Sequence, residues 1–257
     1  MPKLADTTGS QMINLQGGFK YSNTAIEKLD ATNYTLGTLV VDVTGSLSGR
    51  ENDLTRIMRE IVEKLKKEDT ARNILWRVVL FSESQDIVEV HGFKLLMDIN
   101  QDTDYDVVRC YGGTALFDAV GSSLDATVVE AKRLDAKDYD VNAILVFLTD
   151  GDDNDSRIYP TAANVKEKVD EAMRSEALES IRTILVGVNP DGNSNSTWKQ
   201  IVSRKLSEFH AEAELTEYVD MDDFTEDAIK KIILQVSSIT SDTSKKIGSG
   251  GPSQMTF

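Results

Sequence analysis

Three short polar clusters in the sequence combine carboxylate and hydroxyl side chains with glycines. They are Asp42-Val43-Thr44-Gly45-Ser46, Gly112-Gly113-Thr114 and Leu148-Thr149-Asp150-Gly151. Hard cations such as Mg²⁺ or Mn²⁺ take oxygen ligands in a near-octahedral arrangement and usually keep some water. Carboxylates and hydroxyls from these clusters would hold such a cation without filling its coordination shell. The open position would then accept a carboxylate from a partner protein.

Five side chains are the candidate ligands of this metal site, namely Asp42, Thr44, Ser46, Thr114 and Asp150. We expect Thr44 and Ser46 to offer hydroxyl oxygens directly, and Asp42 and Asp150 to supply charge directly or through water. Thr114 becomes a ligand when its loop moves inward, which would couple metal coordination to partner binding. The expected cofactor is Mg²⁺, with Mn²⁺ or Ca²⁺ as alternatives. The competing interpretation is a metal-free domain whose polar residues only satisfy loop backbones.

Alternating strand and helix patterns predict how the clusters are positioned. Apolar runs indicate strands at 36–43, 75–81, 143–148 and 181–188, with short ones at 86–90 and 218–219. Apolar stripes at helical spacing indicate helices at 54–65, 116–134, 162–173, 198–206 and 229–236. Such alternation predicts an α/β fold, a mostly parallel sheet covered by helices on both faces. Ligands of such sheets gather at the carboxyl ends of the strands, where the first and third clusters lie.

The ends of the chain differ from this pattern. Residues 1–35 show no sustained period and predict an N-terminal arm, with Phe19-Lys20-Tyr21 as a short edge strand. The α/β domain is expected over 36–240. Residues 241–257 are rich in Ser, Gly and Lys and predict a flexible tail.

Composition limits the classes of partner and the cellular location that we expect. Asp and Glu number 43 against 28 Lys and Arg, so the formal net charge of −15 disfavours direct contact with nucleic acid. No apolar run is long enough to span a membrane, and the N-terminus lacks a secretory signal. The single cysteine, Cys110, excludes an intrachain disulfide and is expected to be a small buried residue. We therefore expect a cytoplasmic protein.

The three clusters resemble the metal-ion-dependent adhesion site (MIDAS) of von Willebrand factor A (vWA) domains, whose first motif is Asp-x-Ser-x-Ser. The stretch GGTALFDAV resembles the second motif of intracellular bacterial and phage members, and LVFLTDGDDN resembles the third. The similarity runs from about Leu36 to Ile239, with the motifs in the family's order. Thr44 departs from the family pattern, since Ser is usual there, and its extra methyl group crowds the site.

This resemblance implies a Rossmann-like, doubly wound sheet and a non-enzymatic role in metal-dependent protein binding. The chain would serve as an adaptor or scaffold that captures a partner's carboxylate through the cation. Multiprotein assemblies, including those of AAA+ ATPases, are the partners that the resemblance implies. The alternative within the same family is a structural component of a large assembly with a degenerate, metal-free site.

Two other sites were weighed against this one. A calcium-binding EF-hand loop starting at Asp150 fails, because Asp155 stands where Gly is needed and Thr161 where Glu is needed. A phosphoryl-transfer enzyme of the haloacid dehalogenase type would use Asp42 as its nucleophile. Its signature needs a second Asp two residues later, and Thr44 occupies that position.

The remaining conspicuous residues are interpreted as structural. His91 and His210 have no His or Cys partner at metal-binding spacing and are expected on the surface or in the core. Trp76 and Trp198 lie on apolar patterns and are expected in the core. Asp118 is expected to stabilise the start of its helix rather than to bind metal.

Overall fold

The computed structural model describes residues 11–25, 29–189 and 197–221 and, beyond them, Thr225, Asp227, Lys230, Lys231, Leu234 and Thr240. Within these residues one sheet has the strand order β1-β2-β5-β4-β3-β6-β7-β8. The strands are β1 (Gln11–Asn14), β2 (Lys20–Asn23), β3 (Asn33–Asp42), β4 (Ile74–Phe81), β5 (Ile87–Leu95), β6 (Asp140–Thr149), β7 (Ser180–Gly187) and β8 (Glu217–Asp220).

The sheet is mostly parallel, as the sequence predicts. The five strands β4, β3, β6, β7 and β8 run parallel to one another, and β2 pairs in parallel with β5. Only the β1–β2 and β4–β5 pairs are antiparallel. The strand expected at 86–90 is longer than predicted, because β5 continues to Leu95 and pairs along β4 as far as Leu75.

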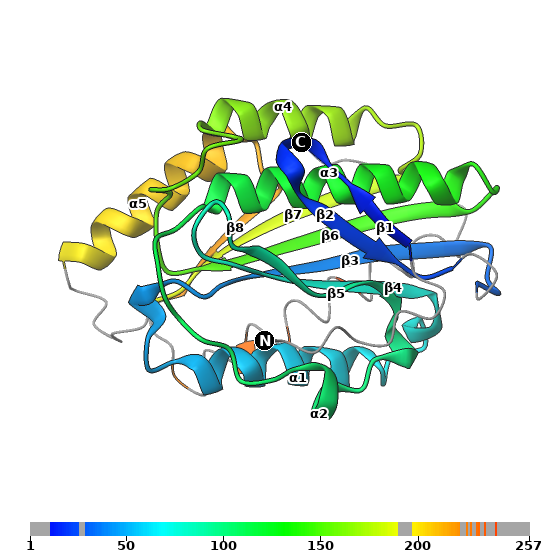
Figure 1. Ribbon diagram of the computed structural model, residues 1–257, viewed down its shortest axis with the longest axis horizontal. Coiled ribbons are helices and arrows are strands. Elements are labelled where there is room, and N and C mark those ends of the chain that lie inside the picture. Colours follow the sequence, from blue (N-terminus) through cyan, green and yellow to red (C-terminus); the bar gives the residue numbers. More distant parts are fainter. Residues whose placement is uncertain are drawn as a thin grey trace.

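Helices cover both faces of the sheet (Figure 1). On one face α3 (Leu116–Asp135) and α4 (Ala162–Met173) lie side by side, and α1 (Glu51–Leu65) lies on the other. The remaining helices are the short α2 (Gln101–Asp104), which the sequence did not predict, and α5 (Thr197–Glu212), which is longer than the predicted 198–206. This is the predicted α/β architecture.

Burial explains why these elements form. The residues Leu54, Ile57, Ile61 and Leu65 of α1 recur every three or four positions and are fully buried, so the helix presents one apolar stripe to the sheet. Strand β6 is buried at every position after Asp140, as expected for a central parallel strand covered on both faces. Two apolar cores result, one on each face of the sheet.

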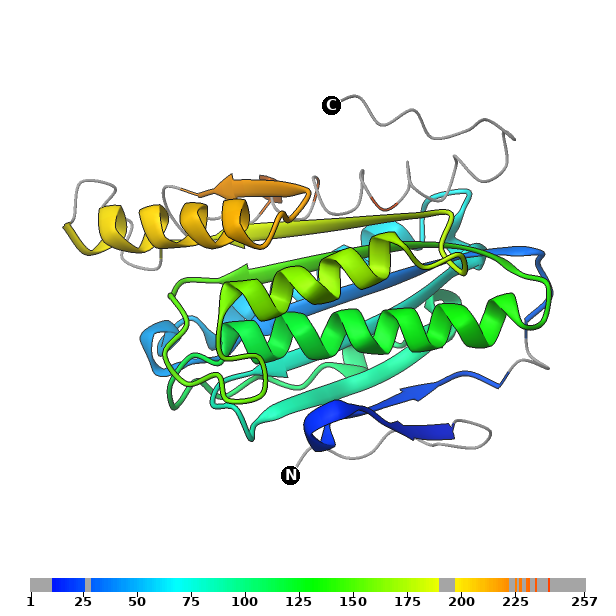
Figure 2. The same cartoon turned by 90° about the horizontal axis from the view of Figure 1, so that it is seen from above.

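The first two strands form a hairpin that extends the sheet beyond β5 (Figure 2). Buried polar groups hold it in place. Glu130 of α3, fully buried, accepts hydrogen bonds from Tyr21 Oη (3.2 Å) and Asn23 Nδ2 (3.1 Å) and forms an ion pair with Arg133. Part of the segment 1–35 therefore packs on the domain as two strands. The strand predicted near Lys20 corresponds to β2, but its predicted place at the edge of the sheet was wrong, because β2 pairs with β5 on one side and with β1 on the other.

Several expectations outside the sheet can be compared with the structure. Trp76 is fully buried, whereas Trp198 is 62% exposed in the first turn of α5, outside the buried face of that helix, so its predicted core placement was wrong. His91 is buried in the middle of β5. No helix in the described ranges is long and apolar enough to cross a membrane. The helix predicted from Ile229, Ile232, Ile233 and Val236 and the tail 241–257 lie outside the described residues.

Candidate metal centre

The first and third clusters meet at the point where the strand order reverses. From β3 the chain passes through α1 to β4 on one side, while β6 pairs with the other side of β3 and leads on to β7. The chain therefore leaves β3 towards one face of the sheet and leaves β6 towards the other, and ligands of such sheets bind where the connections diverge in this way. The first cluster follows β3, and the third spans the end of β6.

A chain of oxygen atoms joins these two clusters. The hydroxyl oxygens of Thr44 and Ser46 lie 3.0 Å apart, and Ser46 Oγ donates to Asp150 Oδ1 at 2.9 Å. Thr44 and Asp150 are buried, whereas Ser46 is exposed. Among these three oxygen-bearing side chains, that of Ser46 is therefore the one that solvent or a partner can reach.

Asp42 lies beneath these groups and is completely buried. Its Oδ1 accepts from the Thr44 N–H (2.8 Å), and its Oδ2 accepts from Thr149 Oγ1 (2.5 Å). Burial raises the pKa of Asp42 to about 6, although hydrogen bonds from Thr149, Thr44 and the Asp150 backbone oppose this shift. A desolvated carboxylate of this kind would be stabilised by a nearby cation.

The second cluster lies against both others. The Gly45 N–H donates to Gly112 O (3.3 Å), and the Tyr111 N–H donates to Val43 O (2.9 Å). A methyl group at Gly151 would lie 3.3 Å from Thr114 Oγ1, which places the Thr114 hydroxyl beside the residue that follows Asp150. The structure thus brings all five predicted ligands to one end of the sheet.

The donor set suits a hard cation. It offers carboxylate and hydroxyl oxygens without a nitrogen or sulfur ligand, as Mg²⁺, Mn²⁺ or Ca²⁺ prefers. Among the described residues, no three His, Cys, Asp or Glu side chains group at metal-binding distances, so hydroxyls are essential to this site. A bound cation would be held by Asp42, Thr44, Ser46, Thr114 and Asp150.

Sequence reasoning missed residues that support the ligands. Thr149 was recognised only as part of a cluster, yet its hydroxyl orients Asp42 and accepts from the Gly151 N–H (3.2 Å). Asn154 was not singled out, although its side chain binds the Thr114 backbone (2.8 Å). The position of Thr149 at the end of a buried strand, next to a predicted ligand, was the available signal. For Asn154 no sequence pattern gave one.

The acidic residues after Asp150 make specific contacts with neighbouring elements instead of forming only a solvated rim. Asp152 pairs with Lys205 of α5 at 2.5 Å. Asp153 accepts from the Phe117 N–H (3.0 Å), and Asp155 accepts from the Ser84 N–H (3.0 Å). These carboxylates fasten the loop to neighbouring elements because the backbone N–H groups at the start of α3 and the end of β4 need acceptors.

Asp118 and Cys110 also lie near the site without being ligands. Asp118 is fully buried and accepts from the N–H groups of Arg157, Ile158 and Tyr159 at 2.7 to 2.9 Å, so it organises the loop after β6 rather than only its own helix. Cys110 is half-buried instead of buried. Burial, together with Glu51, Asp42 and Asp150, raises the pKa of its thiol to about 12, so it stays protonated at neutral pH.

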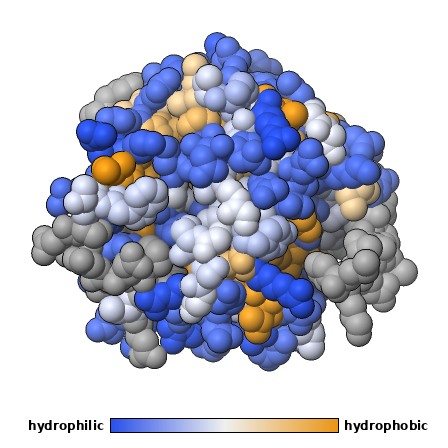
Figure 3. Space-filling view, turned by 60° about the vertical axis from the view of Figure 1, so that its left-hand side comes forward, coloured by the Kyte–Doolittle hydropathy of each residue, from blue (hydrophilic) through white to orange (hydrophobic). Residues whose placement is uncertain are grey.

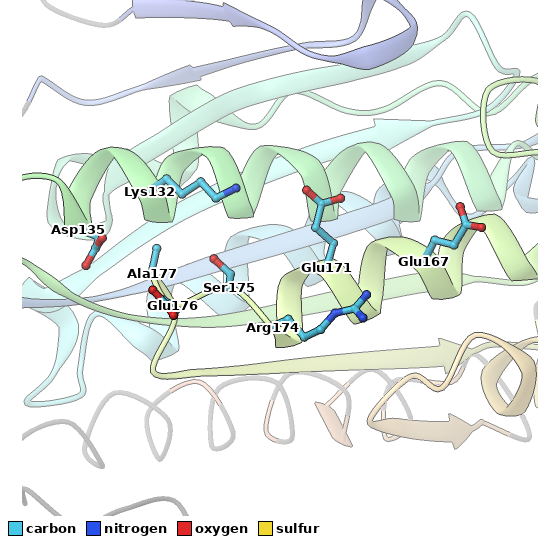
Figure 4. A pocket seen from close by; sticks show the side chains of 8 residues that line it. All are labelled: Lys132, Asp135, Glu167, Glu171, Arg174, Ser175, Glu176 and Ala177. Atoms are coloured by element: carbon cyan, nitrogen blue, oxygen red, sulfur yellow. The ribbon is translucent and has the colours of Figure 1, made fainter.

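A pocket between α3 and α4 lies away from this centre, at the far ends of the two helices (Figure 4). Its lining includes Lys132 and Asp135 of α3 and Glu171 and Arg174 from the end of α4. Because cationic and anionic groups are mixed and none of the three clusters contributes, the pocket has no evident part in metal binding.

The surface at the end of the sheet that carries the clusters is mixed in character. In the view that brings this end forward, pale residues of intermediate hydropathy gather near the middle, among blue hydrophilic residues and smaller orange patches (Figure 3). Tyr111, which is bonded to the first cluster through its N–H, is 49% exposed. Mixed polar and aromatic surfaces of this kind are common at protein interfaces.

Comparison with known proteins gives matches at the level of structure. The sequence matches no protein-family model and no curated protein sequence. Proximal thread matrix protein 1 from the mussel byssus aligns with a TM-score of 0.51 and 19% identity over 83% of this chain and 47% of that chain. The pilus adhesin SpaC from Lactobacillus rhamnosus GG aligns with a TM-score of 0.58 and 11% identity, over 86% of this chain and 32% of that one.

A second structure of the mussel protein, described as having a zinc-occupied MIDAS motif, aligns with a TM-score of 0.50 and 17% identity over 83% of this chain and 47% of that chain. This chain spans about half the length of the mussel protein and about a third of the adhesin. At sequence identities this low, structural similarity is evidence for a shared fold alone. The comparisons and the sheet topology together show that the chain has a von Willebrand factor A-like α/β fold.

Proposed function

We propose that this chain is a non-enzymatic adaptor that binds a partner protein through a divalent cation. The cation is held by Asp42, Thr44, Ser46, Thr114 and Asp150, and a carboxylate of the partner takes its open coordination position. The observation that carries this proposal is the row of oxygens from Thr44 through Ser46 to Asp150, with spacings of 3.0 and 2.9 Å, in which the middle hydroxyl, that of Ser46, is exposed.

Two further observations support the proposal. The fold is shared with a mussel byssus protein whose structure is described as having zinc in a MIDAS motif, so a metal-bound MIDAS motif has a precedent in the fold. Tyr111 offers an exposed aromatic ring next to the first cluster, where a partner would make apolar contact. Multiprotein assemblies, including those built around AAA+ ATPases, are the proposed setting.

The burial of Asp42 disfavours the phosphoryl-transfer alternative. An aspartyl nucleophile has to approach a phosphorus atom, but Asp42 is fully buried and both of its oxygens accept short hydrogen bonds. The position that would carry the second aspartate is Thr44, whose hydroxyl contacts Ser46. The residues present therefore fit metal binding better than covalent catalysis.

Isothermal titration of Mg²⁺ and Mn²⁺ into metal-stripped protein tests the site. We expect saturable one-site binding that is lost in the double variant D42A/S46A. The matched control is D140A/S180A, which removes the same residue types from the first positions of β6 and β7, at the opposite end of the sheet. Equal heats from the wild type and D42A/S46A would mean a metal-free domain and would overturn the proposal.

The open coordination position is tested with bound Mn²⁺ and a small carboxylate. Mn²⁺ with an exchangeable water accelerates the relaxation of bulk water protons, and acetate should reduce this effect by displacing that water. Acetamide, which has a similar shape but no charge, is the control. A relaxation rate that acetate leaves unchanged would argue against capture of a carboxylate.

A further inference from the structure

The start of α3 is capped by side chains from the loop that follows β6. Ala115, the residue before the helix, supplies no capping side chain. Instead the Thr114 N–H donates to Asn154 Oδ1 (2.8 Å), and the Phe117 N–H donates to Asp153 Oδ1 (3.0 Å). The Asp118 N–H donates to Ser156 Oγ (2.9 Å). Because backbone N–H groups at a helix start need acceptors, this loop and the first turn of α3 stabilise each other.

Asn154 makes the most direct contact, because it binds both polar groups of the Thr114 backbone. Its side chain accepts from the Thr114 N–H, and its own N–H donates to Thr114 O at 2.8 Å. A methyl group at Gly113 would lie only 2.9 Å from Asn154 Oδ1, so glycine there makes room for the amide. Both the N–H and the carbonyl of Thr114 are thus hydrogen-bonded to Asn154, and the Thr114 hydroxyl lies beside Gly151.

The loop itself is fixed to the rest of the domain at two further points. Asp155 accepts from the Ser84 N–H after β4 (3.0 Å), and buried Asp118 accepts three consecutive N–H groups from 157–159. Ser84 Oγ also donates to Asp118. The loop after β6, the start of α3 and the end of β4 therefore form one hydrogen-bonded unit. Independent inward movement of the Thr114 loop, which the sequence led us to expect, would break several of these bonds.

We infer that Asn154 is a positioning residue that fixes the Thr114 hydroxyl relative to Asp150, so that both ligands reach the cation as parts of one rigid unit. This inference rests on the proposed metal site and adds how the site is assembled. Asn154 itself is exposed and is not one of the five proposed ligands. Asn154 affects metal binding only by positioning Thr114, so variants of the two residues can test this role.

The test compares Mg²⁺ affinities of four proteins by titration: wild type, N154A, T114V and the double variant. We expect N154A to bind Mg²⁺ at least tenfold more weakly than the wild type. T114V and the double variant should agree with each other within about twofold, because removal of the hydroxyl leaves Asn154 nothing to position. An unchanged affinity in N154A, or losses that multiply in the double variant, would overturn the inference.

Two controls separate a positioning effect from general damage. N154D retains an oxygen that accepts from the Thr114 N–H, so its affinity should be at least half that of the wild type. N73A removes an asparagine that also makes two side-chain hydrogen bonds, to Asn33 at the opposite end of the sheet, and should leave the affinity unchanged. N154D as weak as N154A would contradict the assigned hydrogen bond.

A metal-free readout completes the test. In metal-stripped protein, amide hydrogen exchange at Thr114 should be at least tenfold faster in N154A than in the wild type, and unchanged in N73A. Equal exchange rates would show that Asn154 does not hold the Thr114 backbone. If the wild type itself binds no Mg²⁺, the proposed function fails, and that result is distinct from any difference among the variants.

Discussion

The hydroxyl of Thr149 donates a 2.5 Å hydrogen bond to Oδ2 of Asp42, so the last residue of β6 orients the last residue of the neighbouring strand β3. Both side chains are completely buried. The bond favours the charged form of the carboxylate and opposes the rise in pKa that burial causes. Thr149 is therefore a supporting residue of the candidate metal centre although it is not itself a proposed ligand.

Replacing Thr149 with valine should weaken metal binding. T149V keeps the shape of the side chain but removes the donor, so the pKa of Asp42 rises further and protons compete more strongly with the cation. A hydrogen bond to a charged group contributes about 1.5 to 3 kcal/mol, so a loss of about tenfold or more in Mg²⁺ affinity at pH 7 is expected. Isothermal titration measures this loss directly.

The control for T149V is T127V. Thr127 is equally buried in α3, and its hydroxyl donates within the helix to Ser123 O at 2.9 Å, far from the clusters. This substitution should leave Mg²⁺ affinity within about twofold of the wild type. Similar losses in both variants would indicate general destabilisation rather than loss of the bond to Asp42.

The sequence predicted those parts of the site that depend on local patterns, and it missed those that depend on contacts between distant residues. Strands β3 and β6 were predicted because their apolar runs are long, and the polar residues at their ends indicated Asp42 and Asp150. The parallel pairing that brings Thr149 next to Asp42 is a long-range relationship, so no local pattern revealed it. The capping of α3 by Asn154 was missed for the same reason, since a side chain 40 residues away replaces the usual local cap.

Local patterns failed in a different way at the edges of the fold. Trp198 belongs to an apolar stripe but lies in the first turn of α5, where it is exposed. The hairpin β1–β2 gave little signal because each strand has four residues and the strands are held by buried polar contacts to Glu130 as well as by apolar packing. Short strands with mixed burial carry no clear period of two.

Stability should depend on pH through His91. Its ring is buried between a carbonyl and a hydroxyl, with Nδ1 2.9 Å from Gly92 O and Nε2 2.8 Å from Tyr105 Oη. Because a carbonyl only accepts, Nδ1 carries the proton of the neutral ring and Nε2 accepts from Tyr105. Burial, helped by Lys94 and Arg77, lowers the pKa of His91 to about 4, although the Gly92 carbonyl and Asp104 act in the opposite direction.

The sign of the effect follows from the two states. An unfolded histidine has a pKa near 6.5, so between about pH 6.5 and 4 the unfolded chain binds a proton that the folded chain does not. The free energy of unfolding should therefore decrease as the pH falls through this range, by up to about 1.4 kcal/mol per pH unit from this residue. Urea unfolding of the wild type and H91Q at several pH values measures it.

The difference between the two proteins isolates His91. Asp42 contributes a slope of the opposite sign between about pH 4 and 6, because its pKa is raised in the folded state, but it is present in both proteins. H210Q, which changes the other histidine and retains His91, should keep the wild-type profile. Identical profiles for the wild type and H91Q would contradict a neutral, buried His91.

Removal of Glu130 should release the N-terminal hairpin and destabilise the fold. E130A would leave the Arg133 cation and the donors of Tyr21 and Asn23 without their shared acceptor. Breaking a buried ion pair from one side costs about 3 kcal/mol, and a loss of this size in the free energy of unfolding is expected. Hydrogen exchange should also accelerate in residues 11–23, since the hairpin loses its main polar contact with α3.

The comparison for E130A is E63A. Glu63 pairs with Lys67 at 2.7 Å on the exposed face of α1, where water screens both charges, so its removal should leave stability within experimental error. A large loss in E63A, or a small one in E130A, would show that burial of the carboxylate does not decide the effect.

A methyl group at Gly121 should strain the packing between α3 and the loop after β6. Its Cβ would lie 2.5 Å from Cδ2 of Tyr159, whose ring is buried and whose hydroxyl donates to Asp125 at 2.5 Å. Alanine favours helix over glycine by about 1 kcal/mol, but overpacking of a buried ring typically costs about 1 to 3 kcal/mol. We therefore expect G121A to be less stable than the wild type by about 1 kcal/mol in urea unfolding.

S123A, two residues further along the same helix, should change stability in the opposite direction. The Ser123 hydroxyl is buried and has no hydrogen-bond partner among the described residues, so its removal relieves an unpaired polar group and improves helix propensity. An increase of about 1 kcal/mol in the free energy of unfolding is expected.

The two variants should also differ in Mg²⁺ binding. Because Tyr159 also donates its N–H to Asp118 (2.7 Å), strain from G121A should reach the hydrogen-bonded unit that holds Thr114 and weaken Mg²⁺ binding. S123A should leave Mg²⁺ binding unchanged. Unaltered metal affinity in a destabilised G121A would show that the loop after β6 absorbs the displacement before it reaches the metal centre.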